Sequence, residues 1–205
     1  MKYIDFRKKL KEMLVFNTKE IHKIESDFDS RRLYEWQNKK HIIKIHNGYY
    51  IFSDIKLNEN RLYEIANKIY GHSYISLETA LSYYGLIPEQ SYVILSISTR
   101  KTVKFKTQIG NFYYRKMLKS HFFGYNIEKI GNISWKIASP EKSLIDYFYF
   151  NSDIKIREDI IGIRINSDVF KNLINIDILR KYTEMITNQR VSRCVEYLIE
   201  EMNNA

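Results

Sequence analysis

The sequence predicts an α+β fold in which a small unit of helices and a hairpin precedes a larger domain. Apolar residues recur at helical spacing over the first forty residues, two β-rich runs then flank an Asn-Gly turn, and segments with strand alternation appear after residue 91. We expect a small N-terminal domain over residues 1–56, a helical bridge over 57–73 and a mixed α+β C-terminal domain over 74–205.

The composition excludes several classes of protein. The 205 residues are 44% apolar and 15% aromatic, which is enough to bury a core. Seven Gly and two Pro are too few for a collagen-like chain or a linker. No apolar run approaches the roughly 18 residues of a membrane helix, and the first residues lack a signal-peptide core. We therefore expect a cytoplasmic protein with no membrane partner.

Three short helices are predicted at the start of the chain. Apolar side chains at three-and-four spacing indicate an amphipathic helix over residues 3–14. Asn17, followed three positions later by a glutamate, has the pattern of a capping box that begins a second helix. A third helix is expected to start at residue 29 or 30, to run to residue 39 and to bury Leu33 and Trp36.

The hydrophobic period then changes to that of strands. β-rich runs over 41–45 and 49–52 flank Asn47-Gly48, a strong signal for a hairpin. Three short helices followed by a hairpin are the order of a winged helix-turn-helix, a DNA-binding fold. A helical stretch around residues 62–69 follows without a Pro/Gly/Ser linker, so the two domains are expected to have a fixed relation.

The C-terminal domain is predicted to mix strands and helices. Ser76 is expected to cap a short helix that Gly85 terminates. Ser139, followed by Pro and Glu, is expected to cap another. Apolar spacing predicts a last helix through residues 191–202. Strands are expected over residues 92–97, 103–107, 112–114 and 135–137.

The third helix provides the candidate DNA-reading residues, because a winged helix places the start of that helix in the major groove. The residues expected to face the base edges are Ser30, Arg31, Arg32 and Tyr34. The residues expected to contact phosphates are Thr18, Lys39, Lys40, Lys44 and His46. The alternative is that both arginines form surface ion pairs with nearby acidic residues at 27, 29 or 35.

Basic residues are segregated along the chain. The net charge is +9 overall, and residues 91–140 alone carry nine Lys or Arg against one acidic residue. Seven of these residues form a second basic surface: Arg100, Lys101, Lys104, Lys106, Arg115, Lys116 and Lys119. An alternative function is therefore RNA binding by this surface. The aromatic residues of this segment (Phe112, Tyr113, Tyr114, Phe122 and Phe123) could stack on single-stranded bases or form core.

Three motifs resemble the AbiEi family, antitoxins of type IV toxin–antitoxin systems from bacterial abortive-infection loci. They are residues 74–89 (YISLETALSYYGLIPE), Gly110–Tyr114 with Phe123-Gly124, and Ile137–Asp146 (IASPEKSLID). With the N-terminal unit, the resemblance covers roughly residues 4–150. The segment 151–205 matches no motif of the family, and Asn47 stands where its wing usually has a basic residue.

The resemblance implies a two-part antitoxin. Its N-terminal domain would bind inverted repeats in its own promoter and repress the operon. Its C-terminal domain would counteract a nucleotidyltransferase toxin without forming a stable complex. Since inverted repeats need two readers, we expect a monomer or weak dimer that pairs on DNA. A stand-alone transcriptional regulator is an alternative.

Motifs for catalysis or cofactor binding are absent from the sequence. The five His residues are scattered, Cys194 is single, and no phosphate-binding glycine loop or Gly-x-Ser-x-Gly motif is present. We expect no catalytic residue, metal or cofactor. The enzyme alternative is a nuclease that uses Glu141, Lys142 and Asp146. Against it, Lys142 and Asp146 have the spacing of an ordinary exposed helical ion pair.

Overall fold

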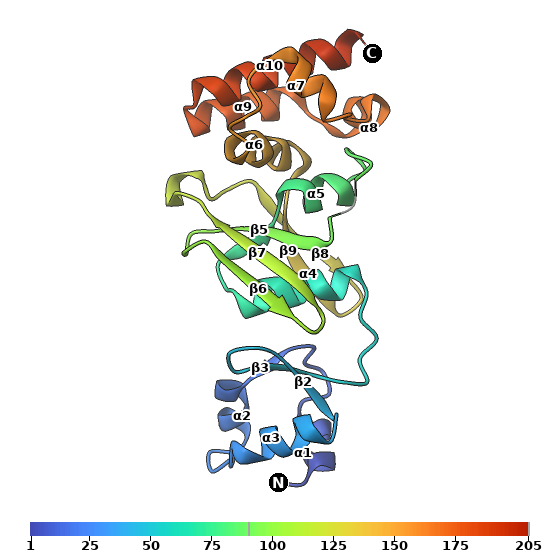
Figure 1. The fold of residues 1–205 in the computed structure, drawn as a ribbon, viewed down its shortest axis with the longest axis vertical. Coiled ribbons are helices and arrows are strands. Elements are labelled where there is room, and N and C mark those ends of the chain that lie inside the picture. Colours follow the sequence, from blue (N-terminus) through green and yellow to red (C-terminus); the bar gives the residue numbers. More distant parts are fainter. Residues whose placement is uncertain (90, 205) are drawn as a thin grey trace.

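The chain is an α+β protein whose elements form three stacked parts (Figure 1). The computed structural model describes residues 1–89 and 91–204. An N-terminal unit lies at one end, a six-stranded sheet with its flanking helices lies in the middle, and a group of helices that includes the C-terminus lies at the other end.

The N-terminal unit comprises the helices and strands up to residue 52. Its helices are α1 (Tyr3–Lys9), α2 (Thr18–Ile24) and α3 (Arg31–Asn38), and its strands are β1 (Phe16–Asn17), β2 (Ile42–His46) and β3 (Tyr49–Phe52). The strands form an antiparallel sheet in the order β1-β3-β2. The predicted hairpin is confirmed, and Gly48 at its turn has φ +76°, a left-handed conformation that favours glycine.

Local signals predicted most of this unit correctly. Asn17 and Glu20 form the expected capping box, with the Glu20 N–H donating to Asn17 Oδ1 at 3.0 Å and the Asn17 N–H donating to Glu20 Oε2 at 2.8 Å. Helix α3 buries Leu33 and Trp36 as predicted. The first helix is shorter than predicted, because Leu10 packs into the core of the N-terminal unit whereas Leu14 packs against the cluster beneath the six-stranded sheet.

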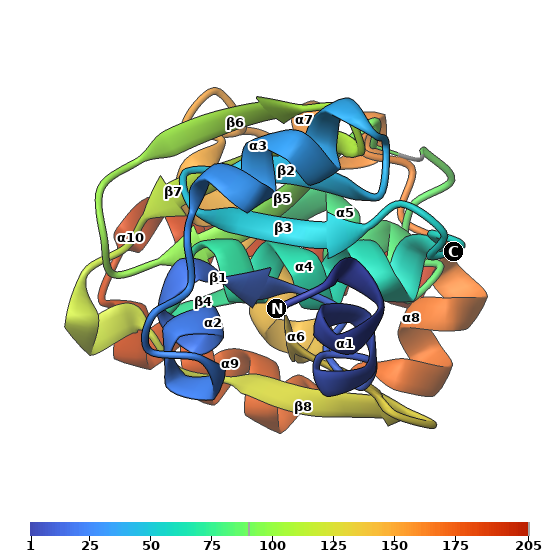
Figure 2. The same cartoon turned by 90° about the horizontal axis from the view of Figure 1, so that it is seen from below.

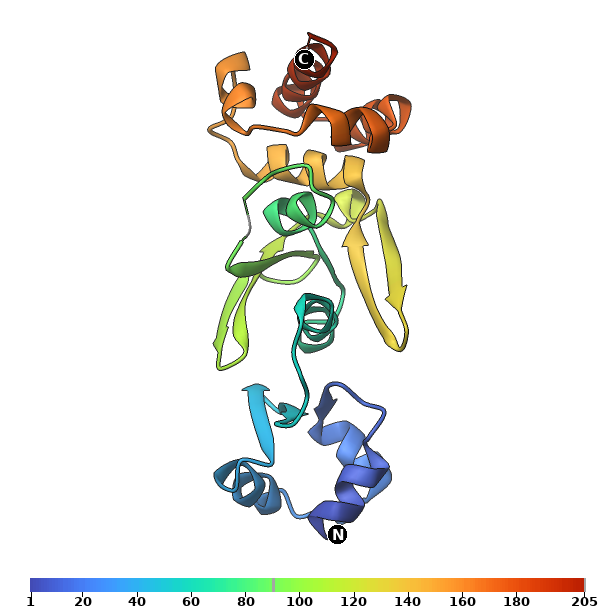
Figure 3. The ribbon, with the colours of Figure 1, turned by 90° about the vertical axis from the view of Figure 1, so that its right-hand side faces the viewer.

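The six-stranded sheet has the order β6-β7-β5-β4-β9-β8. Its strands are β4 (Ser73–Ile75), β5 (Val93–Ser98), β6 (Val103–Thr107), β7 (Gly110–Lys116), β8 (Tyr125–Ile130) and β9 (Ile133–Ala138). The pairs β4–β9 and β5–β7 are parallel and the others are antiparallel. All four predicted strands are confirmed, whereas β4 and β8 were not predicted. Figure 3 shows the β6–β7 and β8–β9 hairpins on either side of α4 (Glu59–Ile69).

Two helices lie against the other side of this sheet, α5 (Leu77–Tyr83) and α6 (Pro140–Phe150). The end group beyond α6 comprises α7 (Arg157–Gly162), α8 (Ser167–Leu173), α9 (Ile176–Ile186) and α10 (Gln189–Asn204), and a short 3-10 helix, η1 (Lys119–His121), lies between β7 and β8. Ser139 caps α6 as predicted, since its Oγ accepts from the Lys142 N–H at 3.2 Å. The predicted capping by Ser76 is wrong: its hydroxyl donates to Asp146 instead, at 2.8 Å. Over residues 1–89 and 91–204, no helix has the length and apolar character needed to cross a membrane.

Candidate nucleic-acid interface

The outer face of α3 is exposed and carries predicted site residues. Leu33 and Trp36 anchor the helix with 2% and 5% of their surface exposed, whereas Tyr34 on the opposite face is 69% exposed. The Arg31 side chain is also almost entirely exposed. Ser30 precedes the helix and is exposed, without forming a side-chain cap. These residues are therefore accessible to a large ligand.

The two arginines of α3 have different surroundings. Arg31 Nε lies 3.2 Å from both carboxylate oxygens of Asp29. The Arg31 backbone N–H and then its guanidinium hold the pKa of the Asp29 carboxyl below its usual range. Such an exposed ion pair contributes little and is easily exchanged for another anion. Arg32, by contrast, is half-buried and donates through Nη1 to the Met1 carbonyl, so it fixes the start of the chain.

The predicted phosphate-contacting residues are also divided. Lys39, Lys40 and Lys44 are exposed. Thr18 is half-buried, and its backbone N–H donates to the Gly48 carbonyl at 3.2 Å, which ties the start of α2 to the turn of the hairpin. His46 is turned toward the six-stranded sheet.

His46 stacks on Phe105 of β6, with ring centroids 3.8 Å apart and an interplanar angle of 24°. Burial, with a smaller contribution from the Lys44 charge, lowers the pKa of the imidazole below its usual value. The neutral ring is therefore favoured at neutral pH. In this position His46 serves as a packing residue between the hairpin and the sheet.

Both faces of the hairpin make buried contacts, although Lys44 on β2 stays exposed. Tyr50 and Phe52 pack toward the helices of the N-terminal unit, whereas Ile45 and Ile51 belong to the cluster beneath the six-stranded sheet. The burial of this second face was not predicted. The uninterrupted apolar run from Tyr49 to Phe52 was the available signal, because strands that are covered on both faces lack polar alternation.

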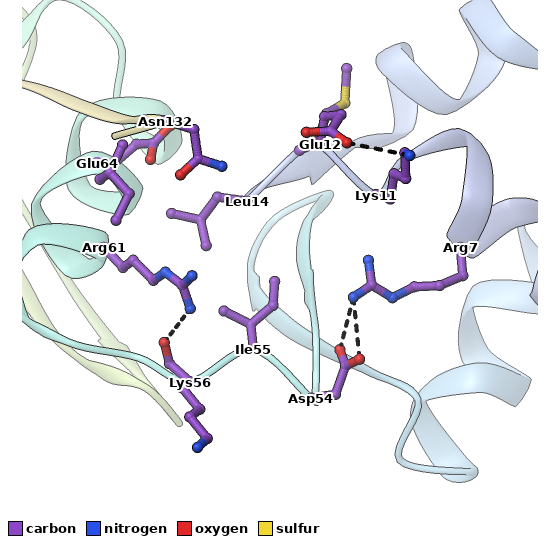
Figure 4. A pocket seen from close by; sticks show the side chains of 12 residues that line it. Arg7, Lys11, Glu12, Leu14, Asp54, Ile55, Lys56, Arg61, Glu64 and Asn132 are labelled. Atoms are coloured by element: carbon purple, nitrogen blue, oxygen red, sulfur yellow. Dashed lines mark hydrogen bonds and ion pairs between the residues drawn. The ribbon is translucent and has the colours of Figure 1, made fainter. Parts of the chain in front are cut away.

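A cleft of about 470 Å³ lies beside this junction (Figure 4). Arg7 Nη2 binds both carboxylate oxygens of Asp54 at 3.2 and 3.3 Å, and Arg61 donates to the Lys56 carbonyl. Side chains of both charge signs thus line the cleft, together with Leu14 and the connection from β3 to α4. This mixture does not favour one class of ligand.

The second basic surface is distributed over several positions in the structure. Lys104 and Lys106 project from β6 and are exposed. Arg100 lies over the Tyr70 ring at 4.6 Å, and Arg115 lies over the Phe150 ring at 4.3 Å. The remaining members are exposed: Lys101, Lys116 and Lys119. Of the aromatic residues in this segment, Phe112 and Tyr114 are core, whereas Tyr113, Phe122 and Phe123 are partly exposed.

The prediction that Lys142 and Asp146 form an exposed pair is wrong. Both are fully buried, and Lys142 Nζ contacts Asp146 Oδ1. Asp146 Oδ2 also accepts from the hydroxyls of Tyr74 at 2.9 Å and Ser76 at 2.8 Å. The spacing along α6 is helical as expected, but β4 and the loop before β8 cover this side of the helix.

This buried cluster bears on the nuclease alternative. Glu141 is also buried, and its carboxylate accepts from the Ser139 hydroxyl at 2.9 Å and the Asn175 N–H at 3.0 Å. Lys142 and Asp146 have no exposed surface and Glu141 exposes only 6% of its surface, so their placement gives the nuclease alternative no support. Over the described parts of the chain, no group of three or more His, Cys, Asp or Glu is arranged to hold a metal ion.

Comparison with protein-family models and with curated proteins adds no relative. No protein-family model matches the chain, and no curated protein matches it. The resemblance to the AbiEi family therefore depends on the three motifs alone. In the structure, segments of two motifs meet around one cluster, since Tyr74 and Ser76 from the first and Lys142 and Asp146 from the last bind one another.

Proposed function

We propose that this protein is a DNA-binding antitoxin and transcriptional autorepressor of a type IV toxin–antitoxin operon. In this proposal the N-terminal unit is a winged helix-turn-helix that reads inverted repeats in its own promoter. The observation that carries the proposal is the outer face of α3, where Arg31 and Tyr34 are exposed on a helix anchored by Leu33 and Trp36.

The exposed residues have the chemistry that duplex recognition needs. Arg31 can exchange the exposed Asp29 for a guanine edge, to which an arginine donates two hydrogen bonds. Lys39, Lys40 and Lys44 are placed at the end of α3 and on the hairpin, where a winged helix meets phosphates. We no longer include Arg32 and His46 among the DNA-contacting residues, because Arg32 binds the Met1 carbonyl and His46 stacks on Phe105.

The junction between the N-terminal unit and the six-stranded sheet supports a model in which the whole chain binds DNA as one rigid body. Because the hairpin packs on the six-stranded sheet, the N-terminal unit and the rest of the chain share one hydrophobic cluster. Two such bodies on inverted repeats would sit about 34–36 Å apart for sites one helical turn apart. We propose a monomer or weak dimer that pairs on DNA.

The antitoxin part of the proposal depends on the motifs. The C-terminal part would counteract a cognate nucleotidyltransferase toxin encoded in the same operon, in the cytoplasm, without a stable complex and without catalysis. Two of the motifs converge on the Lys142–Asp146 cluster, which joins α6 to β4, so they belong to one structural core.

A reporter assay tests the two halves of the proposal separately. Expression of the chain should reduce transcription from the promoter upstream of its own gene, and the double variant Arg31→Ala/Tyr34→Ala should not. Cells that express the nucleotidyltransferase toxin of the same operon should stop growing, and co-expression of this chain should restore their growth. Repression without growth rescue would indicate the stand-alone regulator, and absence of repression by the wild type would refute DNA reading.

A further inference from the structure

One face of the β6–β7 hairpin carries a row of polar and cationic side chains. In the register of the two strands, Lys104 lies opposite Tyr113 and Lys106 lies opposite Asn111. Arg115 follows Tyr113 by two residues and so points to the same side of the sheet. We name these five residues the β6–β7 platform.

The platform is open and has no carboxylate partner. Lys104, Lys106 and Asn111 are exposed and Tyr113 is partly exposed, whereas Phe105 and other residues of the opposite face are buried. Residues 91–127 contain seven Lys or Arg and no Asp or Glu. Among the described residues, no salt bridge involves a member of the platform. A polyanion can therefore approach without displacing a carboxylate.

The platform combines an aromatic ring with flanking cations. The Lys104 ammonium lies 4.5 Å from the centre of the Tyr113 ring. Alternate residues of a strand are about 7 Å apart, so Lys104 and Lys106 can reach successive phosphates of an extended chain. Aromatic rings beside a cationic track are the arrangement by which proteins hold unpaired bases and their backbone.

We infer that the β6–β7 platform binds a single strand of nucleic acid, with a base stacked on Tyr113 and phosphates bound by Lys104 and Lys106. This site lies outside the duplex-reading face of α3 and is independent of it. Arg115 positions the end of β7, because it donates to the Phe150 carbonyl at 3.4 Å and lies over the Phe150 ring.

A single strand fits this surface better than a duplex. The bases of a duplex stack on one another, so their faces are not available to Tyr113, whereas an unpaired base exposes its face. Figures 2 and 3 show α3 and the β6–β7 hairpin on the same side of the molecule. A long duplex bound by α3 could therefore also pass over the platform, and the test must separate these two modes.

Fluorescence anisotropy with the full chain provides the test. The probe is a labelled oligouridylate RNA of about ten nucleotides, and the competitors are oligothymidylate of the same length and a mixed-sequence DNA duplex. We expect Tyr113→Ala to weaken binding about tenfold and Tyr113→Phe to retain it, since stacking needs the ring and not the hydroxyl. Lys104→Gln/Lys106→Gln should reduce the slope of log affinity against log salt by about 1.4.

Two control variants distinguish the site from general charge and from duplex reading. Lys129→Gln removes an exposed lysine from β8 at the opposite edge of the same sheet, and Arg31→Ala alters the face of α3. Both should bind the RNA probe as the wild type does. The inference is wrong if Tyr113→Ala binds within twofold of the wild type, or if Lys129→Gln weakens binding as much as the platform variants. It is also wrong if the duplex competes better than both single strands in the Arg31→Ala/Tyr34→Ala variant, in which the α3 face no longer reads a duplex. The strand that binds more tightly, RNA or DNA, identifies which kind of single strand the platform binds.

Discussion

His46 and Phe105 stack across the junction between the hairpin of the N-terminal unit and the edge strand of the six-stranded sheet. Ile45 and Ile51 of the hairpin contribute to the same junction by packing into the cluster beneath that sheet. The part of the molecule that carries α3 is therefore held to the rest of the chain by a hydrophobic contact.

The His46 contact predicts that stability decreases in mild acid. Burial lowers the pKa of folded His46 below the 6.5 of an unperturbed histidine. The unfolded chain thus binds a proton at a higher pH than the folded chain does. The stabilisation is present above about pH 6.5 and is lost as the pH falls through the folded pKa.

Thermal melting of the wild type and His46→Phe at about pH 7.5 and about pH 5.5 checks this prediction. Phenylalanine keeps an aromatic ring at the position and does not titrate. We expect Tm to fall less between the two pH values in the variant than in the wild type. The pKa of His121 is also lowered mainly by burial, but His121 is present in both proteins, so its contribution to the change in Tm cancels in the comparison. Equal decreases in Tm would contradict the assignment.

The buried ion pair predicts a large loss of stability in Lys142→Met. This change leaves the Asp146 carboxylate without its cation at a site with no exposed surface. Removing one partner of such a pair costs roughly 3–5 kcal/mol. The free energy of unfolding, measured with urea, should fall by that amount. Arg180→Gln removes the exposed pair with Glu196 and serves as the control, with only a slight change expected. A Lys142→Met variant as stable as this control would refute the prediction.

Two glycines with similar positive φ angles should respond differently to alanine. Gly124 has φ +70°, and a Cβ there would lie 2.9 Å from Tyr182 Cε2 and 3.1 Å from Lys142 Cγ. Gly131 has φ +60° and nothing within 4 Å of such a Cβ. Gly131→Ala should therefore lose only about 1 kcal/mol of stability through its backbone. Gly124→Ala should lose roughly 1–3 kcal/mol more through overpacking. Urea unfolding of both variants measures the difference, and equal losses would show that the neighbours of Gly124 move away without cost.

Local patterns predicted the elements whose residues interact within a few positions. The capping box at Asn17, the turn at Gly48 and the burial of Leu33 and Trp36 each follow from short-range spacing, and each is confirmed. Strand β4 was not predicted because its three residues are all buried and show no alternation.

Long-range contacts explain what the sequence did not predict at the candidate site. The spacing of Lys142 and Asp146 placed them on one turn of helix but did not reveal that Tyr74, which lies 72 residues before Asp146, covers them. His46 likewise follows the predicted strand next to the turn, where the sequence predicted a phosphate contact. Its stacking on Phe105 depends on how the six-stranded sheet packs against the hairpin. Nothing in the local pattern of either residue specifies its distant partner.

The exposed lysines near α3 predict a salt-dependent contribution to DNA affinity. Lys40→Gln and Lys44→Gln should each reduce the slope of log affinity against log salt by about 0.9, the value for one lost phosphate contact on duplex DNA. Their preference for one sequence over another should not change. Titrations of the same duplex at several salt concentrations measure the slope. Lys129→Gln on β8 is the matched control, and a slope reduced equally in this control would show that overall charge alone is responsible.

The most direct test of the account is the ratio of affinities for the DNA upstream of the protein's own gene and for a shuffled duplex of the same length. The wild type should prefer the upstream DNA by a factor on the order of a thousand or more. Arg31→Ala should lower that ratio about tenfold or more through the loss of a guanine contact. A wild-type protein that binds the two duplexes equally would contradict the claim that the outer face of α3 reads DNA.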